Sequence, residues 1–264
     1  MIVAEALRTL EAREARLLLA RATGFSEASV LAHPEQELPA PAEAQFREFA
    51  ARRACGEPIA YILGEKEFYG LALAVNPAVL IPRPETELLV ELALSRRPAS
   101  VLDLGTGCGA IALAVKRHLP QARVVAVEAS AAALAVAQRN AVKLGLEVEL
   151  LHGRWFEPVG NASFALIVAN PPYVAEGDPH LSEGDLRFEP RGALVCGGDG
   201  LDAIREIARA APAHLQPGGW LLLEHGMGQD DAVRALLRQA GLEDISAWPD
   251  LAGIARVAGG RLKC

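Results

Sequence analysis

The 264-residue sequence has few cysteines, few aromatic residues and no long apolar run. Its four cysteines, Cys55, Cys108, Cys196 and Cys264, lack CxxC or zinc-ligand spacing, so we predict no metal site and free thiols in a reducing compartment. No run of 18 apolar residues suggests a membrane span, and no basic segment precedes an apolar one near the start. We therefore expect a cytoplasmic protein that does not contact a membrane.

The chain also lacks an excess of positive charge. Its formal net charge is −7, whereas proteins that bind duplex nucleic acid usually carry a basic face. We therefore expect no direct nucleic-acid binding, although a local basic patch could be hidden in the total. The hydrophobic fraction of 51% is enough for a large core, in one large domain or two unequal ones.

The most informative stretch is Asn170-Pro171-Pro172-Tyr173, which follows the apolar run 164–169. Two prolines cannot continue a central strand, because each lacks an N–H and fixes φ at about −65°. The predicted strand therefore ends at Asn170, at the edge where open α/β sheets bind ligands. The Asn170 carboxamide and a backbone carbonyl could hold both hydrogens of a planar –NH2 group. Alternatively, the segment is a proline-rich turn that only ends the strand.

A glycine loop lies between an apolar strand, 101–104, and a helical stretch, 110–115. The loop is Gly105-Thr106-Gly107-Cys108-Gly109. Strand, glycine loop and helix form the nucleotide-binding unit of doubly wound sheets, because glycine allows positive φ and close approach of a ligand. Glu128 ends the next predicted strand, 123–127, where an acid binds ribose hydroxyls in such folds. Cys108 is interpreted as a small packing residue rather than a nucleophile.

The loop spacing favours S-adenosylmethionine over a dinucleotide. It reads G-x-G-x-G instead of G-x-G-x-x-G, and no Lys-Ser/Thr pair follows as in a P-loop. Asp103 lies directly before the loop, where a carboxylate would repel a pyrophosphate but attract an ammonium group. S-adenosylmethionine has an ammonium group and a ribose but no phosphate.

Together, these motifs resemble those of class I S-adenosylmethionine-dependent methyltransferases that act on a planar amine. Three further stretches, 61–70 (YILGEKEFYG), 80–87 (LIPRPETE) and 185–190 (DLRFEP), narrow the resemblance. With them, the chain from about residue 60 to residue 261 resembles the HemK/PrmC family, which methylates a glutamine in peptide-chain release factors. The NPPY segment alone is less specific, since DNA adenine methyltransferases also contain it.

The resemblance implies a cofactor site. The five loop residues Gly105, Thr106, Gly107, Cys108 and Gly109 would enclose the methionine part of S-adenosylmethionine. Glu128 would bind the ribose hydroxyls, and Trp155 would flank the adenine. Arg154 stands where many relatives carry an acid, which leaves the partner of the adenine amine open.

The resemblance also implies a substrate site made of Asn170, Pro171, Pro172 and Tyr173. Asn170 and the Pro171 carbonyl would accept hydrogen bonds from the glutamine amide of a release factor, and Tyr173 would pack against the amide plane. Asn170 would also contact the cofactor. Holding the reacting groups in line can lower the barrier by roughly 7–11 kcal/mol. No general base is evident, so we expect the proton to be lost to water after methyl transfer.

Residues 1–65 are predicted to form a small helical domain that helps recognise the protein substrate in the family; a solvated helical bundle is the plainer interpretation. Apolar residues at helical spacing predict a helix over 2–22, with Gly24 after its end and Ser26 as the cap of the next helix. Pro41 opens a further predicted helix that continues to Ala54.

A β-hairpin is predicted at 66–80, within the linker 66–82, and residues 83–264 are predicted to form the α/β methyltransferase domain. Helices are expected at 82–96, 130–144, 200–214 and 228–240, and further strands at 147–151, 164–169, 219–225, 244–248 and 253–258. This alternation implies a doubly wound, mostly parallel, seven-stranded sheet. The last two strands are too close in sequence for a crossover helix, so the last strand should be antiparallel.

Three segments have open interpretations. Arg83 and Glu85 either cap a helix and form a surface pair or lie over the cofactor pocket. The long connection 174–198 is predicted to be a substrate-facing lid. Glu224-His225-Gly226 ends a strand at the binding edge and could contact ligand, but a structural role is favoured.

Two other functions remain open at this point. A nucleic-acid amine methyltransferase, acting on adenine or guanine, would use the same NPPY geometry, and a basic channel leading to Tyr173 would favour it. A Rossmann oxidoreductase or a catalytically silent binding module is disfavoured by the loop spacing and by NPPY. If the protein failed to bind S-adenosylmethionine, one of these two alternatives would be favoured again.

Overall fold

The computed structural model describes residues 1–264, which form two compact units. The first comprises Met1–Glu65 and Ser182–Phe188, and the second comprises Lys66–Leu181 and Glu189–Cys264. Ser182–Phe188 joins the first unit because Asp185 pairs with Arg53 at 3.2 Å and Arg187 donates a hydrogen bond to the Cys55 carbonyl at 3.1 Å. The sequence did not predict this association. No helix is both long and apolar enough to cross a membrane.

Five helices make up the N-terminal part of the first unit: α1 (Val3–Ala6), α2 (Ala12–Thr23), α3 (Glu27–Ala32), α4 (Ala40–Ala54) and α5 (Ile59–Leu63). The continuous helix predicted over 2–22 is wrong. Its spacing is helical, but Thr9 donates to the Ala6 carbonyl and Glu11 accepts the first free N–H groups of α2, so the chain restarts there. The predicted cap at Ser26 is confirmed, since its hydroxyl accepts from the Ser29 N–H at 3.1 Å.

A two-stranded hairpin opens the second unit, with β1 at Glu65–Phe68 and β2 at Leu71–Ala74. It ends earlier than the predicted residue 80, because the Asn76 side chain accepts the Ala78 N–H and starts a turn. Asn140, on helix α8 (Ala131–Leu144), bonds both the N–H and the carbonyl of Ala74, at 2.7 and 3.0 Å. Its amino group also donates to the Cys108 carbonyl at 2.9 Å. One buried amide therefore connects the hairpin, a helix and the glycine loop.

The main sheet has seven strands in the order β5-β4-β3-β6-β7-β9-β8. They are β3 (Ser100–Leu104), β4 (Arg123–Glu128), β5 (Glu149–His152), β6 (Phe164–Ala169), β7 (Leu215–Glu224), β8 (Glu243–Pro249) and β9 (Ala255–Arg261). Only β9 runs against its neighbours, pairing antiparallel with β7 and β8. The predicted seven-stranded sheet with an antiparallel last strand is confirmed. β7 begins before the predicted residue 219, with an irregular register between its first and later pairs.

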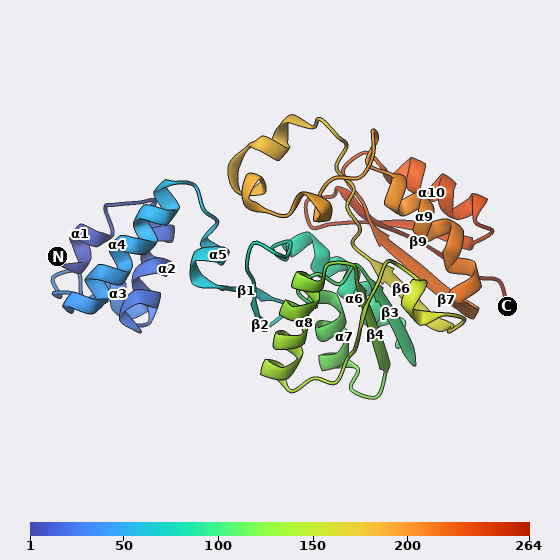
Figure 1. Ribbon diagram of the computed structural model, residues 1–264, viewed down its shortest axis with the longest axis horizontal. Helices are drawn as coiled ribbons and strands as arrows, with labels where there is room; N and C mark the ends of the chain where they lie inside the picture. Colours follow the sequence, from blue (N-terminus) through green and yellow to red (C-terminus); the bar gives the residue numbers. More distant parts are fainter. The chain divides into compact units, whose positions relative to one another are not determined.

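Helices cover both faces of this sheet (Figure 1). α6 (Glu87–Ser95), α7 (Ala110–His118) and α8 pack on one face, and α9 (Asp202–Ala210) and α10 (Asp230–Gln239) pack on the other. Right-handed crossovers explain the division, because the chain moves outward from β3 to β5 and then in the opposite direction from β6. The helix predicted over 200–214 ends at Ala210 and continues as a 3-10 turn, Ala211–His214, because Pro212 cannot donate a helical hydrogen bond.

The reversal of direction occurs between β3 and β6, which are neighbours although β4 and β5 lie between them in sequence. Their parallel register pairs Leu104 with Ala169. Gly105 therefore follows β3 and Asn170 follows β6 at the same level of the sheet, so the glycine loop and the NPPY segment begin side by side. This is the switch point at which open α/β sheets bind ligands.

Replacing Asn140 by leucine tests the connection between hairpin, helix and glycine loop. The side chain keeps its approximate size, but two Ala74 groups and the Cys108 carbonyl lose their partners. We expect Asn140→Leu to lower the free energy of unfolding by roughly 3–5 kcal/mol, measured by urea denaturation. Gln138→Leu, an exposed change on the same helix, should alter it by less than about 0.5 kcal/mol. Equal stability of the two variants would contradict this role of Asn140.

Candidate active site

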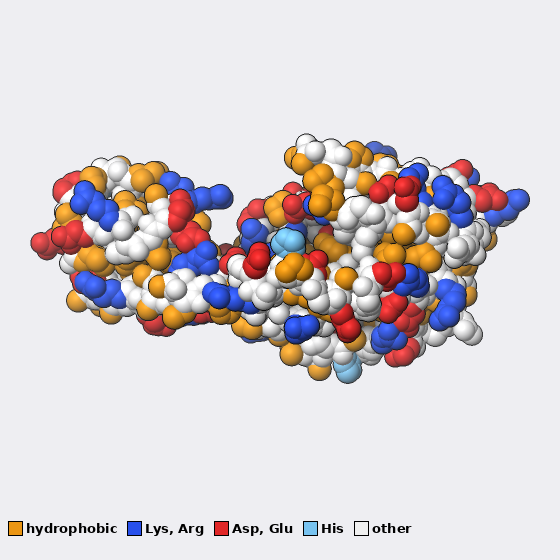
Figure 2. All heavy atoms as spheres, turned by 90° about the horizontal axis from the view of Figure 1, so that it is seen from above, with side chains coloured by type: hydrophobic (Ala, Val, Ile, Leu, Met, Phe, Trp, Pro, Cys, Tyr) orange, Lys and Arg blue, Asp and Glu red, His pale blue; other side chains and the backbone are white.

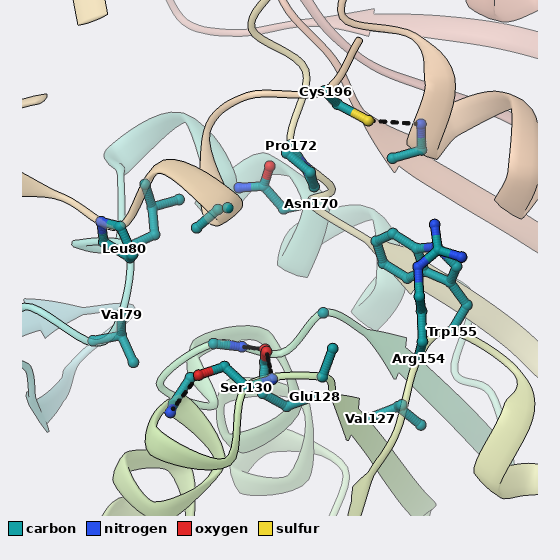
Figure 3. A pocket seen from close by; sticks show the side chains of 18 of the residues that line it. Val79, Leu80, Val127, Glu128, Ser130, Arg154, Trp155, Asn170, Pro172 and Cys196 are labelled. Atoms are coloured by element: carbon teal, nitrogen blue, oxygen red, sulfur yellow. Dashed lines mark hydrogen bonds between the residues drawn. The ribbon is translucent and has the colours of Figure 1, made fainter. Parts of the chain in front are cut away.

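A cavity of about 580 Å3 opens at the carboxyl ends of β3, β4 and β6. Figure 3 shows Asn170 and Pro172 on one side of it, facing Glu128 and Ser130 across the space. Its other lining residues include Val79, Leu80, Gly105, Gly107, Arg154, Trp155, Pro190, Val195 and Cys196. The two motifs predicted from the sequence, the glycine loop and NPPY, thus contribute to one cavity.

Gly105 and Gly107 line this cavity with their backbones, at φ values of 71° and 58°. The indole of Trp155 packs on Gly105, and a Cβ added at Gly105 would lie 3.4 Å from the ring. Glycine is therefore favoured at Gly105 by the positive φ, while an added Cβ would only touch the indole at an ordinary contact distance. The buried Trp155 Nε1 has no hydrogen-bond partner.

Three other loop residues predicted to bind cofactor, Thr106, Cys108 and Gly109, do not line the cavity. Thr106 is buried and donates its hydroxyl proton to Asp103 Oδ2 at 2.6 Å, and Gly109 begins α7 in the left-handed conformation. Burial raises the pKa of the Cys108 thiol to about 12, so a neutral thiol packs there, as interpreted from the sequence.

Asp103 does not line the cavity either, so its carboxylate is not placed to contact an ammonium group there, as the sequence had suggested. The side chain is completely buried beneath the loop, where it accepts from Thr106 and from the Ala112 N–H of α7 at 3.2 Å. Burial raises the pKa of Asp103 to about 7, and the negative charge of Glu128 adds to the effect. Asp103 therefore holds the loop against the start of α7.

Glu128, the acid at the end of β4, does line the cavity. Its carboxylate is held by two backbone donors, Gly107 N at 2.9 Å and Ser130 N at 2.8 Å. These bonds leave further lone pairs for a ligand, because a carboxylate can accept about four hydrogen bonds. Ser130 was not predicted as a site residue, although its position two residues after Glu128 was a usable signal.

Arg154, at one end of the cavity, forms a bidentate ion pair with Glu206 of α9. One of the two hydrogen bonds, from Nη1 to Oε1, measures 2.7 Å. Arg154 is the only Lys or Arg side chain that lines the cavity, and its charge is already paired. The cavity is therefore poorly suited to bind a pyrophosphate.

Asn170 follows β6 with its carboxamide at the cavity wall (Figure 3). Its Nδ2 donates to the Thr86 hydroxyl at 3.1 Å, and its Oδ1 accepts no hydrogen bond from the protein. Pro172 also lines the cavity, whereas Pro171 is buried and no residue donates to its carbonyl. Asn170 Oδ1 therefore remains available for a ligand in the cavity, and contact of the Pro171 carbonyl with a ligand stays a prediction.

Tyr173 does not line the cavity, and its hydroxyl points into the protein, where it donates to Glu224 Oε1 at 3.2 Å. Burial and the nearby Glu224 raise the pKa of Tyr173. The Tyr173 carbonyl accepts from Gln229 Nε2 at 3.0 Å. The NPPY turn is thus fastened at its last residue; contact of the Tyr173 ring with a substrate amide stays a prediction.

Glu224 is a buried acid at the end of β7, with 1% of its surface exposed, and the sequence favoured only a structural role for it. Burial raises its pKa to about 7, while hydrogen bonding from Thr86 and Tyr173 opposes the shift. Its Oε2 is buried without a partner. Thr86 precedes α6 and is also buried. Sequence patterns did not reveal this pair, since the two residues meet only through the fold.

The connection after NPPY is anchored beside the cavity by Glu189. This buried acid pairs with Arg83 and accepts from the Ile81 N–H at 3.0 Å. Arg83 therefore pairs with Glu189 rather than with Glu85. Several residues that follow Glu189 line the cavity: Pro190, Gly192, Ala193, Val195 and Cys196.

Comparison with known proteins identifies the family. The chain is 53% identical to the release factor glutamine methyltransferase of Bordetella pertussis, over 94% of each chain. It is 50% identical to that of Burkholderia pseudomallei, over 98% of this chain and 95% of the relative. This chain belongs to the release factor glutamine methyltransferase family. The resemblance inferred from the sequence motifs is confirmed.

Two family models match separate parts of this methyltransferase: a PrmC N-terminal domain at residues 3–64 and a methyltransferase small domain at residues 84–184. Among solved structures, a Pyrococcus furiosus methyltransferase matches with a TM-score of 0.60 at 19% identity, over 81% of this chain and 98% of that one. A Thermus thermophilus 16S rRNA N2 G1207 methyltransferase matches with a TM-score of 0.57 at 24% identity, over 75% and 50% of the two chains. At these identities the structures support the fold alone.

The raised pKa of Asp103 predicts how the stability of this family member depends on pH. Because the pKa is about 7 in the folded chain and about 3.8 ordinarily, the folded state retains a proton that the unfolded state releases between these values. Its contribution is complete below pH 3.8 and is lost as the pH rises through 7. We expect Asp103→Asn to flatten the fall in melting temperature between pH 5 and pH 8.

The matched control for this titration is Asp231→Asn, which removes an acid from an exposed position. Its melting temperature should follow the wild-type pH dependence. An Asp103→Asn profile parallel to wild type would show that Asp103 does not titrate in this range.

Proposed function

We propose that this chain transfers a methyl group from S-adenosylmethionine to the side-chain amide nitrogen of the glutamine in the GGQ motif of peptide-chain release factors. Family membership over nearly the whole chain supports the substrate class. The observation that carries the mechanism is Asn170, whose carboxamide lines the cavity with Oδ1 free of protein donors.

The residues of the cavity fit S-adenosylmethionine. Gly105 and Gly107 let a ligand approach the loop backbone, and Glu128 offers lone pairs to ribose hydroxyls. Trp155 supplies an aromatic surface beside the loop. The single lining cation, Arg154, is neutralised by Glu206, in keeping with a ligand that has no phosphate. When bound, this cofactor supplies an activated methyl group.

The contribution of the protein is to orient the substrate amide. An amide nitrogen is a weak nucleophile, because its lone pair is delocalised into the carbonyl. Asn170 Oδ1 and the Pro171 carbonyl accept its two N–H bonds, which increases electron density on nitrogen and directs it to the methyl carbon. Both acceptors are fixed by the fold and stabilise the positive charge that develops.

Bond changes at the amide follow from this arrangement. When bound, S-adenosylmethionine would supply the methyl group, and the electron pair of its C–S bond would leave with sulfur as the substrate N–C bond forms. The nitrogen then loses one proton to water. No lining side chain is assigned as a base, since the Glu128 carboxylate, held by the Gly107 and Ser130 N–H groups, is assigned to the ribose hydroxyls.

A nucleic-acid amine is the less favoured substrate. Such an enzyme should have a continuous basic surface leading to its site. On the face of the larger unit in Figure 2, Lys and Arg side chains are interspersed with Asp and Glu. The curated relatives that align with the whole chain are named for release factor glutamine, not for a base.

The first unit is assigned to substrate recognition. Its core of apolar residues, including Leu18, Leu19 and Phe46, is separate from the sheet domain. The match to a PrmC N-terminal domain supports a role specific to this family. We also retain the assignment of 174–198 as a substrate-facing lid, supported by the cavity lining between Pro190 and Cys196.

Gly105→Ala tests the cofactor site. A side chain at φ 71° is strained and would add a methyl group to the loop surface that lines the cavity, so we expect the affinity for S-adenosylmethionine to fall at least tenfold in calorimetry. Gly145→Ala is the matched control, because Gly145 has a similar φ of 64° but ends α8 in open space. It should lose stability without losing affinity; unchanged affinity in Gly105→Ala would refute the assignment.

Asn170→Ala tests the substrate site. Methyl-labelled S-adenosylmethionine is incubated with a release factor whose GGQ glutamine is intact or replaced by alanine. Wild type should label only the intact factor, and Asn170→Ala should reduce kcat by roughly 100-fold, because a fixed acceptor is lost. Asn161→Ala, an exposed control, should keep wild-type turnover. Near-normal kcat in Asn170→Ala would rule out the proposed mechanism, and label on the alanine factor would rule out the glutamine.

A further inference from the structure

A buried polar pair lies directly behind the NPPY segment and takes no part in the steps described so far. Thr86 and Glu224 are 4% and 1% exposed, on segments 138 residues apart in the sequence. Glu224 accepts from the Tyr173 hydroxyl at 3.2 Å, and the nearby Thr86 hydroxyl lowers the pKa of the same carboxyl group. Thr86 in turn accepts from Asn170 Nδ2 at 3.1 Å.

The single hydroxyl hydrogen of Thr86 determines which group donates and which accepts in these hydrogen bonds. A threonine hydroxyl has a single hydrogen, and an ionised carboxylate can only accept. The Thr86 hydrogen is therefore drawn to Glu224, which leaves the Thr86 oxygen to accept from Asn170. Only the amino end of the Asn170 carboxamide can satisfy that oxygen. Its other end, Oδ1, is then the group left for a ligand.

The rotation of this carboxamide matters because its two ends have opposite hydrogen-bonding character. With Oδ1 available, Asn170 accepts an N–H of the substrate –NH2 group. If the carboxamide turned by 180°, it would present N–H donors to another N–H donor, and the substrate nitrogen would lose its acceptor. The two orientations have nearly the same shape, so packing alone distinguishes them poorly.

We propose that Glu224 and Thr86 are positioning residues that fix the rotation of the Asn170 carboxamide, so that its oxygen accepts from the substrate amide. The inference rests on the proposed function, because it assigns to Asn170 the acceptor role described there. Neither residue touches the reacting atoms, and each acts through Asn170. Glu224 also holds the Tyr173 hydroxyl, so the first and last residues of the NPPY segment share one buried anchor.

Protonation of Glu224 would reverse the direction of the chain of hydrogen bonds, because a carboxylic acid can donate to Thr86. Burial and repulsion by Glu85 raise the pKa of Glu224 to about 7, opposed by the hydrogen bonds from Thr86 and Tyr173 and by attraction to Arg256. These are the charged and titratable groups that act on it from the NPPY segment, the segment before α6 and β9. Turnover should therefore decrease as the pH falls below about 7.

The first test removes the hydroxyl and then restores it. Thr86→Val keeps the shape of the side chain but can neither donate to Glu224 nor accept from Asn170. With a release factor and methyl-labelled S-adenosylmethionine, we expect kcat to fall at least tenfold, while the calorimetric affinity for S-adenosylmethionine changes less than twofold. Thr86→Ser, which restores the hydroxyl, should recover most of kcat. Wild-type kcat in Thr86→Val would overturn the inference.

The second test separates positioning from simple structural support. The wild-type kcat should show an acid limb near pH 7, and Glu224→Gln, which cannot ionise, should lack that limb. A residue that only supported the fold would lower kcat equally at every pH. Persistence of the limb in Glu224→Gln would overturn the inference even if Thr86→Val failed to fold.

Failure of the inference is distinct from failure of the proposed function. A wild-type enzyme that labels no release factor overturns the proposed function, and the inference with it. An active wild type whose Thr86→Val and Glu224→Gln variants have its kcat and its pH profile overturns only the positioning role.

Discussion

The parallel pairing of β3 with β6 is the constraint on which the site depends. Because Leu104 is paired with Ala169, the next residues, Gly105 and Asn170, leave the sheet from adjacent strands. Neighbouring strands are about 4.8 Å apart, so the two halves of the site are held near each other by the backbone hydrogen bonds of the sheet. No movement of a domain is needed to bring these halves together. Prolines on one side and glycines on the other then stop the pairing.

Buried polar side chains hold the loops that leave this edge. Asp103 fixes the glycine loop from below, Asn140 ties the same loop to the hairpin, and Glu189 anchors the connection beyond NPPY. Each is almost fully buried and has specific partners. Such groups cost stability unless they are bonded, so their bonds select one arrangement of each loop. The site is thus rigid because acids and amides, rather than apolar contacts, set the positions of its loops.

The sequence predicted best what depends on local chemistry. Strand 164–169 was predicted with its observed bounds, because an apolar run meets two prolines, and Glu128 was placed at its strand end. Helix 2–22 was wrong, since spacing alone does not show that Glu11 starts a new helix. The Thr86–Glu224 pair could not be predicted, because only tertiary packing brings residues so distant in sequence together. Asp103 was misjudged for the same reason. Its place at the end of β3 was predicted, but its side chain points beneath the loop because it bonds to Thr106 and to the Ala112 N–H.

The packing of Trp155 on Gly105 gives the cavity its own optical reporter. The chain has three tryptophans, and the other two, Trp220 and Trp248, pack with each other and with the Arg96 guanidinium away from the cavity. Only the Trp155 indole is placed where an incoming ligand would change its surroundings. Ligand binding should therefore change the fluorescence of Trp155, while the emission of Trp220 and Trp248 stays constant. The occupancy of the cavity can thus be followed without an attached label.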